Sequence, residues 1–216
     1  MEMFIPELYE QIDNAEYNGS VDANFSGGLG ILAGCTMEGF SDIGLNSVAI
    51  IPMYAKRLVQ KIDDDLKQVI TQAEINYSTN KNLEKFIDQE TGEQLEIVVF
   101  VKNVKYSVKI WQINRSGSKV YLLDCPSVFD VLYVGSREKR LLQEVLFGKV
   151  VPVLLKTLDI KPAILHLNEA HGVLSAVNIR EWKNITSGDD FFDDTRILFT
   201  IHTPRLAGLE VFNTAF

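Results

Sequence analysis

The three histidines of this chain all lie in or beside short polar segments that follow predicted strands. His166 and His171 belong to "HLNEAH", and His202 begins "HTPRLAG". Imidazole can donate, accept or transfer a proton near neutral pH. In an open parallel sheet, the loops that follow the strands converge at one edge, where ligands bind. The positions of the histidines therefore predict a polar site at that edge.

The segment "HLNEAH" has two interpretations that the sequence leaves open. In the first, Asn168 caps a helix that begins near Ala170, and His166 is a buried structural histidine. In the second, Asn168, Glu169 and His171 form a polar floor that hydrogen-bonds sugar hydroxyls. No metal site is expected, because His166 and His171 are five residues apart, whereas a zinc pair on a helix needs an i, i+4 spacing and a third ligand.

The segment that begins at His202 also has two interpretations. It is either a strand end broken by Pro204 or a histidine directed into the site. A serine hydrolase is not favoured, because the nucleophile elbow GxSxG is absent. Cys35 lies in an apolar helical stretch, so we expect a buried thiol rather than a nucleophile.

A glycine-rich segment, "SGGLG", precedes a predicted helix near the start of the chain. Gly27, Gly28 and Gly30 have no side chain to block an oxygen-rich ligand, so their backbone N–H groups at a helix N-terminus suit a phosphate. The spacing matches neither GxGxxG nor a P-loop, and a purely structural tight turn is an equal alternative. Gly34 lies within the helix and indicates close packing. The helix is expected to bury Leu29, Leu32, Phe40 and Ile43.

The elements that must position these residues follow from periodicity. Residues 95–101, 106–113 and 119–125 alternate as strands, and "NRSGS" predicts an antiparallel hairpin turn. The most polar stretch, 63–82, is expected to carry a loop. We place a β-rich insertion at about 63–125 within a single domain that covers residues 1–216.

The second half of the chain alternates between helical and strand patterns. Leu142, Leu146, Val150, Val153 and Leu154 define one side of a helix over 136–158, which Pro152 should kink or divide. Buried strands are expected at 161–167 and 196–201, with a helix over 170–183 between them. This order predicts an α/β, Rossmann-like, doubly wound and mostly parallel sheet with an antiparallel β insertion.

Composition excludes several classes of protein. The chain has 21 basic and 29 acidic residues, so neither a nucleic-acid partner nor an anionic membrane surface is expected. Its two cysteines are far apart in sequence, which favours a reducing compartment. No apolar stretch is long enough to span a bilayer, and the N-terminus lacks the features of a signal peptide. We therefore expect a cytoplasmic protein.

Several motifs together resemble one family. "SGGLGILAG", "SDIGLNSV", "REKRLLQEVLFG", "LHLNEAHG" and "FTIHTPRLAG" occur in the order and approximate spacing found in α-glucan (glycogen or maltodextrin) phosphorylases. "VYLLDCP" is similar to the strand that precedes the family's long helix. The chain resembles the N-terminal domain of these enzymes.

The resemblance implies a GT-B architecture of two Rossmann-like domains and the reversible phosphorolysis of an α-1,4-glucan to glucose 1-phosphate. It implies pyridoxal phosphate as the cofactor, held by a lysine of the C-terminal domain, and α-glucan with phosphate or glucose 1-phosphate as ligands. By the matched positions, Gly27 and Gly28 contact phosphates, Leu29 lines the glucosyl site, and His202 contacts the transferred glucose as the catalytic histidine. Glu169 and His171 match a polar loop close to that site.

The chain ends at Phe216, before the family's lysine-bearing domain, so we expect it to be inactive alone. A homodimer is left open. One alternative is a glycogen or starch synthase, which shares the GT-B fold but prefers other residues at Ile31, Leu32 and Ala170. Another is a non-catalytic Rossmann-like module that binds a sugar or a partner protein.

Overall fold

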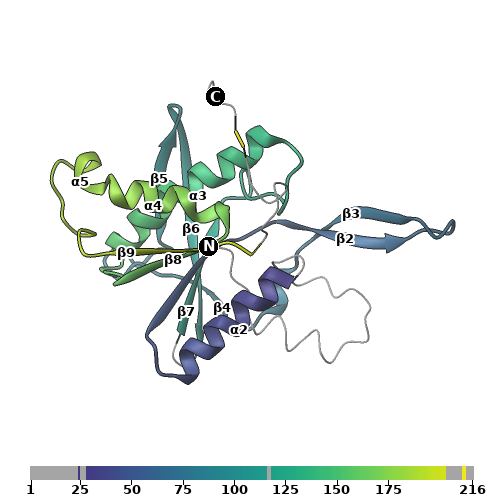
Figure 1. The fold of residues 1–216 in the computed structure, drawn as a ribbon, viewed down its shortest axis with the longest axis horizontal. Coiled ribbons are helices and arrows are strands. Elements are labelled where there is room, and N and C mark those ends of the chain that lie inside the picture. Colours follow the sequence, from purple (N-terminus) through teal and green to yellow (C-terminus); the bar gives the residue numbers. More distant parts are fainter. Residues whose placement is uncertain (1–23, 25–27, 116–117, 203–210, 213–216) are drawn as a thin grey trace. The chain divides into compact units, whose positions relative to one another are not determined.

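The computed structural model describes residues 24, 28–115, 118–202 and 211–212 (Figure 1). Its contacts divide the chain into two compact units. The glycine-loop unit contains the described residues up to Leu95 together with Lys109–Tyr133. The histidine unit contains Glu96–Val108 and the described residues from Val134 onward. The sequence predicted a single domain over residues 1–216, and this stays a prediction, because a division by contacts does not show whether the two units fold separately.

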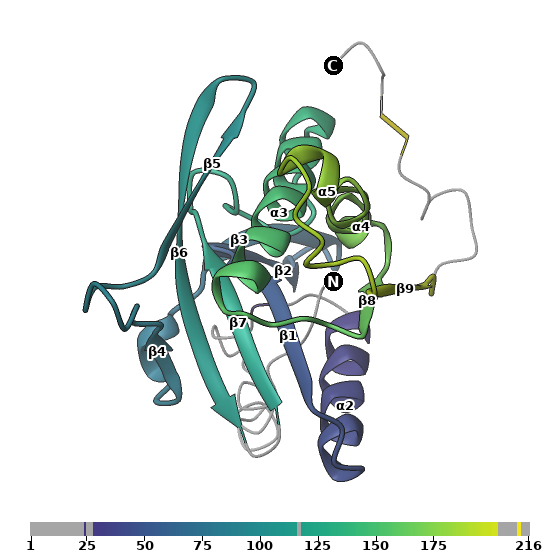
Figure 2. The same ribbon diagram turned by 90° about the vertical axis from the view of Figure 1, so that its left-hand side faces the viewer.

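The glycine-loop unit is built on a mixed sheet (Figure 2). β1 pairs in parallel with β7, and β6 pairs antiparallel with both β7 and β4. The antiparallel strands predicted around "NRSGS" are thereby confirmed, although turn residues 116–117 lie outside the described part of the chain. The elements of this unit are α2 (Gly28–Asp42), β1 (Ser47–Pro52), β2 (Lys56–Ile62), β3 (Gln68–Glu74), the 3₁₀ turn η1 (Tyr77–Thr79), β4 (Leu83–Lys85), part of β6 (Val104–Arg115) and β7 (Ser118–Asp124).

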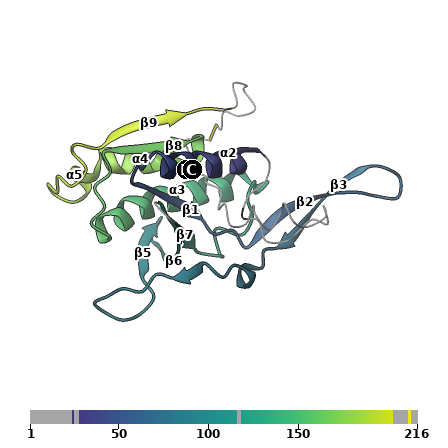
Figure 3. The same cartoon turned by 90° about the horizontal axis from the view of Figure 1, so that it is seen from below.

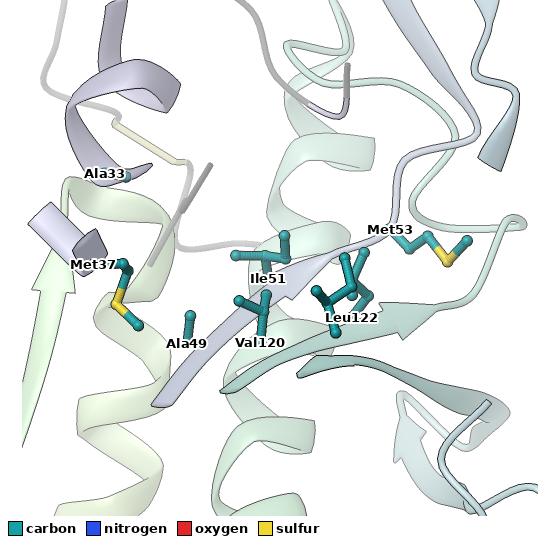
Figure 4. Close-up of a cluster of buried hydrophobic side chains, with 8 residues drawn as sticks. Ala33, Met37, Ala49, Ile51, Met53, Val120 and Leu122 are labelled. Atoms are coloured by element: carbon teal, nitrogen blue, oxygen red, sulfur yellow. The ribbon is translucent and has the colours of Figure 1, made fainter. Parts of the chain in front are cut away.

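The core of this unit lies between α2 and the β1–β7 pair (Figure 4). Ala33 and Met37 of α2 pack in one buried cluster with Ile51 of β1 and Leu122 of β7. Burial of apolar surface stabilises such a cluster by about 25 cal/mol per Å². The packing fixes α2, and with it the end of the glycine loop, against the parallel strands.

The buried face of α2 differs from the expected one. Leu32 is 43% exposed and Ile43 is 77% exposed, whereas the buried residues are Gly30, Ala33, Gly34 and Met37. These four have the i, i+3, i+4, i+7 spacing of one helix face. Three of them are small and let the helix backbone approach the sheet closely. Of the expected residues, Phe40 does pack against the buried cluster, whereas Leu32 and Ile43 face solvent. Cys35 lies off this face and is exposed, so the predicted burial of its thiol is wrong.

The segment expected to be a polar loop is largely a β-hairpin. β2 and β3 pair antiparallel with Lys56 opposite Glu74 and Ile62 opposite Gln68, as the two-stranded ribbon in Figure 3 shows. The Asp63 carboxylate accepts hydrogen bonds from the backbone N–H groups of Asp65 and Lys67 and so closes the turn. Polar composition suggested a loop because most side chains of β3 face solvent.

The histidine unit combines helices with a two-stranded parallel sheet. Its elements are β5 (Glu96–Val101), the start of β6, α3 (Arg137–Thr157), β8 (Ile164–Asn168), η2 (Ala170–Gly172), α4 (Val173–Arg180), α5 (Trp182–Ile185) and β9 (Arg196–Thr200). β5 and β6 are joined by Lys102 and Asn103, both with positive φ. Such a two-residue turn is typical of an antiparallel hairpin. None of the described helices combines the length and apolar character needed to cross a membrane.

The long helix α3 confirms the helix predicted over 136–158. The Ser136 hydroxyl caps it by accepting a hydrogen bond from the Lys139 N–H, and Leu146, Val150 and Leu154 are fully buried. Pro152 lies inside the helix and does not divide it. The helix predicted over 170–183 is also present, but it is split into η2, α4 and α5.

The strand predicted over 196–201 is present but not buried. In β9, Leu198 is 49% exposed and Phe199 is 44% exposed. An apolar run of this kind is typical of a strand covered on both faces. Among the described strands, β9 pairs only with β8, so its other edge has no strand beside it.

Candidate functional site

The β8–β9 ladder brings two of the predicted polar segments together. The strands are parallel, with Leu165 opposite Ile197 and Asn168 opposite Thr200. Both strands therefore end at the same edge, where "NEAH" leaves β8 and His202 follows β9. Convergence of these two segments was predicted from the order of the elements and is confirmed.

The His202 side chain is held by Asn168. Its Nε2 lies 2.6 Å from Asn168 Oδ1, across 34 residues of sequence. An amide oxygen only accepts, so Nε2 carries the proton in this pair. Nδ1 of the neutral ring is then the nitrogen that can accept a hydrogen bond from a ligand hydroxyl. Asn168 was also a candidate helix cap, but the N-cap residues of η2 and α4 are Glu169 and Gly172, and neither cap residue makes a side-chain cap hydrogen bond.

Glu169 holds the main chain on both sides of this pair. Its N–H donates to the Thr200 carbonyl at 2.9 Å, which continues the ladder past β8. Its carboxylate Oε1 accepts from the His202 N–H at 2.7 Å. Glu169 is 7% exposed, with φ 66° and ψ −178°. This backbone region is almost restricted to glycine and costs about 1–3 kcal/mol for another residue.

His166 lies two residues before Asn168 on the same strand. Its Nε2 is 2.8 Å from the Thr200 hydroxyl, which agrees with a structural, hydrogen-bonded histidine. Burial, followed by the charge of the nearby His202, lowers the pKa of His166. His166 is therefore expected to stay neutral at physiological pH.

His171 is placed in η2, which packs against β8, α3 and α4. The residue is half-buried, and both ring nitrogens are shielded from solvent. Its predicted contact with a sugar stays a prediction. The same holds for the ligand roles of Asn168, Glu169 and His202.

The glycine segment is described only in part. Gly27 lies outside the described residues, whereas Gly28 and Leu29 begin α2. A Cβ at Gly28 would meet nothing within 4 Å, so its side is open. Leu29 is half-buried. The predicted phosphate contacts of Gly27 and Gly28 and the glucosyl contact of Leu29 remain predictions.

Asn24, just before the glycine segment, is a residue that sequence reasoning missed. Its side-chain Nδ2 donates to the carbonyl of Pro52, the last residue of β1, at 2.8 Å. Its Oδ1 accepts from the Tyr54 N–H at 3.0 Å and from the Tyr77 hydroxyl at 2.8 Å. The buried amide thus attaches the start of the glycine segment to the carboxyl end of β1. No local spacing signals this role, because Tyr77 is 53 residues away in sequence.

Tyr77 completes this attachment. Its hydroxyl is also 2.7 Å from the Tyr54 carbonyl, so one buried phenol has two acceptors. Burial is the main cause that raises the pKa of Tyr77 well above its ordinary value, and the charges of Asp124 and Tyr54 add to it. The phenol therefore stays protonated, as a donor must.

The groups at the β8–β9 edge do not fit the pyridoxal aldehyde. Within the described part of the chain, no three His, Cys, Asp or Glu residues gather as metal ligands. The hydrogen-bonded groups at this edge are imidazoles, an amide, a carboxylate and a hydroxyl. A pyridoxal aldehyde needs a lysine amine for its Schiff base, and none is among them.

Residues 23–213 match the family model described as the starch synthase catalytic domain. The chain belongs to this family. It is also 32% identical over 206 residues to the maltodextrin phosphorylase of Thermococcus litoralis, covering 88% of this chain and 24% of that protein. It is 30% identical over 194 residues to the glycogen phosphorylase of Aquifex aeolicus, covering 83% of this chain and 28% of that protein. The expected similarity to α-glucan phosphorylases is confirmed.

A solved structure supports the fold. The catalytic domain of starch synthase IV from Arabidopsis thaliana, bound to ADP and acarbose, has a TM-score of 0.57 to this chain at 19% identity. The match covers 81% of this chain and 30% of that one. The chain thus has the Rossmann-like α/β fold of a GT-B glycosyltransferase domain, as predicted. It spans about a quarter of the length of the curated relatives it matches.

Proposed function

We propose that this chain forms the glucan-binding part of an α-glucan phosphorylase, which transfers a terminal glucosyl unit of an α-1,4-glucan to inorganic phosphate. Identities of 30–32% to a maltodextrin and a glycogen phosphorylase support this proposal. The observation that carries the proposal is the orientation of His202 at the joint end of β8 and β9 by Asn168 and Glu169. A fixed imidazole suits the recognition of a sugar hydroxyl.

In the proposed reaction, the C1–O4 bond of the terminal glucose breaks, a C1–O–phosphate bond forms, and O4 of the remaining glucan takes up a proton. His202 would hold the transferred glucose, with Nδ1 accepting from a hydroxyl while Nε2 donates to Asn168. Pre-orientation of this kind lowers the entropy cost of reaching the transition state. The glycine segment would offer backbone N–H groups to the phosphate. Pyridoxal phosphate, in the complete enzyme, would supply the phosphate group that assists proton transfer.

A synthase that uses a nucleotide sugar is the second candidate function. The match of residues 23–213 to the starch synthase catalytic domain favours it. The two functions differ in the sugar donor, glucose 1-phosphate for the phosphorylase and a nucleoside diphosphate glucose for the synthase.

Titration of the ¹⁵N-labelled chain with maltopentaose, glucose 1-phosphate and ADP-glucose separates the candidates. We expect maltopentaose and glucose 1-phosphate to shift resonances of Asn168 and His202, and ADP-glucose to shift them less. His202→Ala should weaken maltopentaose binding about tenfold or more. His166→Asn is the matched control, because His166 bonds to Thr200 rather than to the proposed ligand.

Preferential binding of ADP-glucose would favour the synthase. Glucan binding without any effect of glucose 1-phosphate would indicate a non-catalytic sugar-binding module. Assays of the chain alone with maltopentaose and phosphate should give no turnover, and measurable glucose 1-phosphate would contradict that expectation.

A further inference from the structure

We infer that Glu169 is a positioning residue for His202 rather than a ligand of the sugar. This inference rests on the proposed function only in the role it gives His202, because the contacts of Glu169 are independent of any substrate. The sequence places Glu169 among the substrate-binding residues. Its carboxylate is instead directed to the main chain of the same unit.

The first step is the position of the carboxylate. Glu169 is 7% exposed, and its Oε1 is 2.7 Å from the His202 nitrogen. A charged acceptor makes this hydrogen bond stronger than one to a neutral oxygen. A carboxylate that is buried and bonded in this way would lose that bond if it turned towards a ligand.

The second step is the backbone of Glu169. Its φ of 66° with ψ of −178° is unfavourable for a residue with a Cβ. A glycine would adopt this conformation without the cost, so the glutamate occupies this position against its own backbone preference. The Thr200 carbonyl accepts from the Glu169 N–H at 2.9 Å and holds the strained residue in place.

The third step is the connection to the imidazole. Thr200 ends β9 and His202 lies two residues later, so the Glu169 N–H and its carboxylate fix both sides of the intervening Ile201. With its own nitrogen fixed, His202 directs its ring to Asn168 Oδ1 at 2.6 Å. Glu169 thereby selects the ring position, and Asn168 selects the tautomer with the proton on Nε2.

The test uses Glu169→Gln, Glu169→Ala and Glu169→Gly in the full chain, with Glu181→Ala as the matched control. Gln keeps an acceptor oxygen, Ala removes it, and Gly removes it together with the backbone strain. The Glu181 carboxylate accepts a surface hydrogen bond from Asn184 in the same unit, away from the Glu169–His202 hydrogen bond. Gly should fold even where Ala does not, because its backbone accepts the positive φ without strain.

Three properties are measured for each variant: hydrogen exchange of the His202 amide, the tautomer of its ring from ¹⁵N shifts, and the affinity for maltopentaose. We expect exchange to be about tenfold faster or more in Ala and Gly, and nearly unchanged in Gln and in the Glu181 control. In Ala and Gly the ring should change from the pure Nε2–H tautomer to a mixture, and affinity should fall while Gln restores it.

Unchanged His202 exchange and tautomer in Glu169→Gly would overturn the inference. Loss of affinity in Glu169→Gln with an unchanged His202 amide and ring would also overturn it, because Glu169 would then bind the sugar directly. If the unmodified chain binds no maltopentaose, the proposed function fails, whereas the exchange and tautomer measurements still decide the role of Glu169.

Discussion

Replacement of Gly148 by alanine tests the packing that supports the histidine unit. Gly148 is buried in α3 where this helix meets α4. A Cβ at this position would lie 2.6 Å from Leu174 Cβ, 2.8 Å from its carbonyl carbon and 3.1 Å from its carbonyl oxygen. Two of these atoms belong to the backbone, so the helices must separate to accommodate a methyl group. Such overpacking costs about 1–3 kcal/mol.

Alanine also has a higher helix propensity than glycine, by about 1 kcal/mol, which opposes that cost. Because two of the contacted atoms are backbone, the overpacking cost should lie in the upper part of its range, about 2–3 kcal/mol. We therefore expect Gly148→Ala to lower the free energy of unfolding by about 1–2 kcal/mol and the Tm by about 2–8 °C. Gly39→Ala in α2 is the control, because a Cβ there meets nothing within 4 Å. It should stabilise the chain by about 0.5–1 kcal/mol.

Thermal and urea unfolding followed by circular dichroism measure both variants. The reasoning about the α3–α4 contact is refuted if Gly148→Ala is as stable as Gly39→Ala. Equal stability would mean that the two helices do not approach each other at Gly148 as closely as the structure shows.

Three further predictions concern titration and reactivity. Because burial raises the pKa of Tyr77, its contribution to the free energy of unfolding is present below the ordinary phenol pKa of about 10 and is lost as pH rises beyond it. Urea unfolding from pH 8 to 11 should show this loss of stability. Tyr77→Phe should reduce the dependence of stability on pH in this range and should cost about 1–2 kcal/mol at pH 8. The pKa of His166 is lowered, so its contribution to the free energy of unfolding is present above the ordinary histidine pKa of about 6.5 and is lost as pH falls through that value. Unfolding between pH 8 and 5 should become less pH-dependent in His166→Asn, and an unchanged slope would argue against the shift. The exposed Cys35 should react rapidly with a thiol-specific reagent and the buried Cys125 only on unfolding; a fast reaction that persists in Cys35→Ser would contradict this assignment.

Strand and helix patterns in the sequence predicted most of the elements, because burial of one face imposes a period on the chain. The strands around "NRSGS" and the helix with Leu146, Val150 and Leu154 inside follow this rule. β3 does not, since most of its side chains face solvent and it has little apolar pattern to detect. On α2, the buried face contains Gly30, Ala33 and Gly34 beside Met37, so a search for large apolar residues found Phe40, which packs against this cluster, but wrongly included Leu32 and Ile43.

The candidate site was predictable at the level of segments but not of contacts. Parallel pairing of β8 and β9 requires that Asn168 and His202 come close, and the sequence order was enough to expect this. The role of Glu169 depends on a positive φ that no propensity assigns to glutamate. The role of Asn24 depends on partners that are distant in sequence and meet it only in the folded chain.

A common requirement explains why Asn24 and Glu169 act on the main chain. Beyond the last ladder pair of a strand, backbone N–H and carbonyl groups have lost their partners and must be satisfied in another way. In the glycine-loop unit, the Asn24 amide satisfies the Pro52 carbonyl and the Tyr54 N–H at the end of β1. In the histidine unit, Glu169 satisfies the His202 N–H just beyond β9. The polar side chains of Asn24 and Glu169 at the strand ends thus already bond to the main chain. His202 Nδ1 and the glycine N–H groups are therefore the better candidates for ligand contacts.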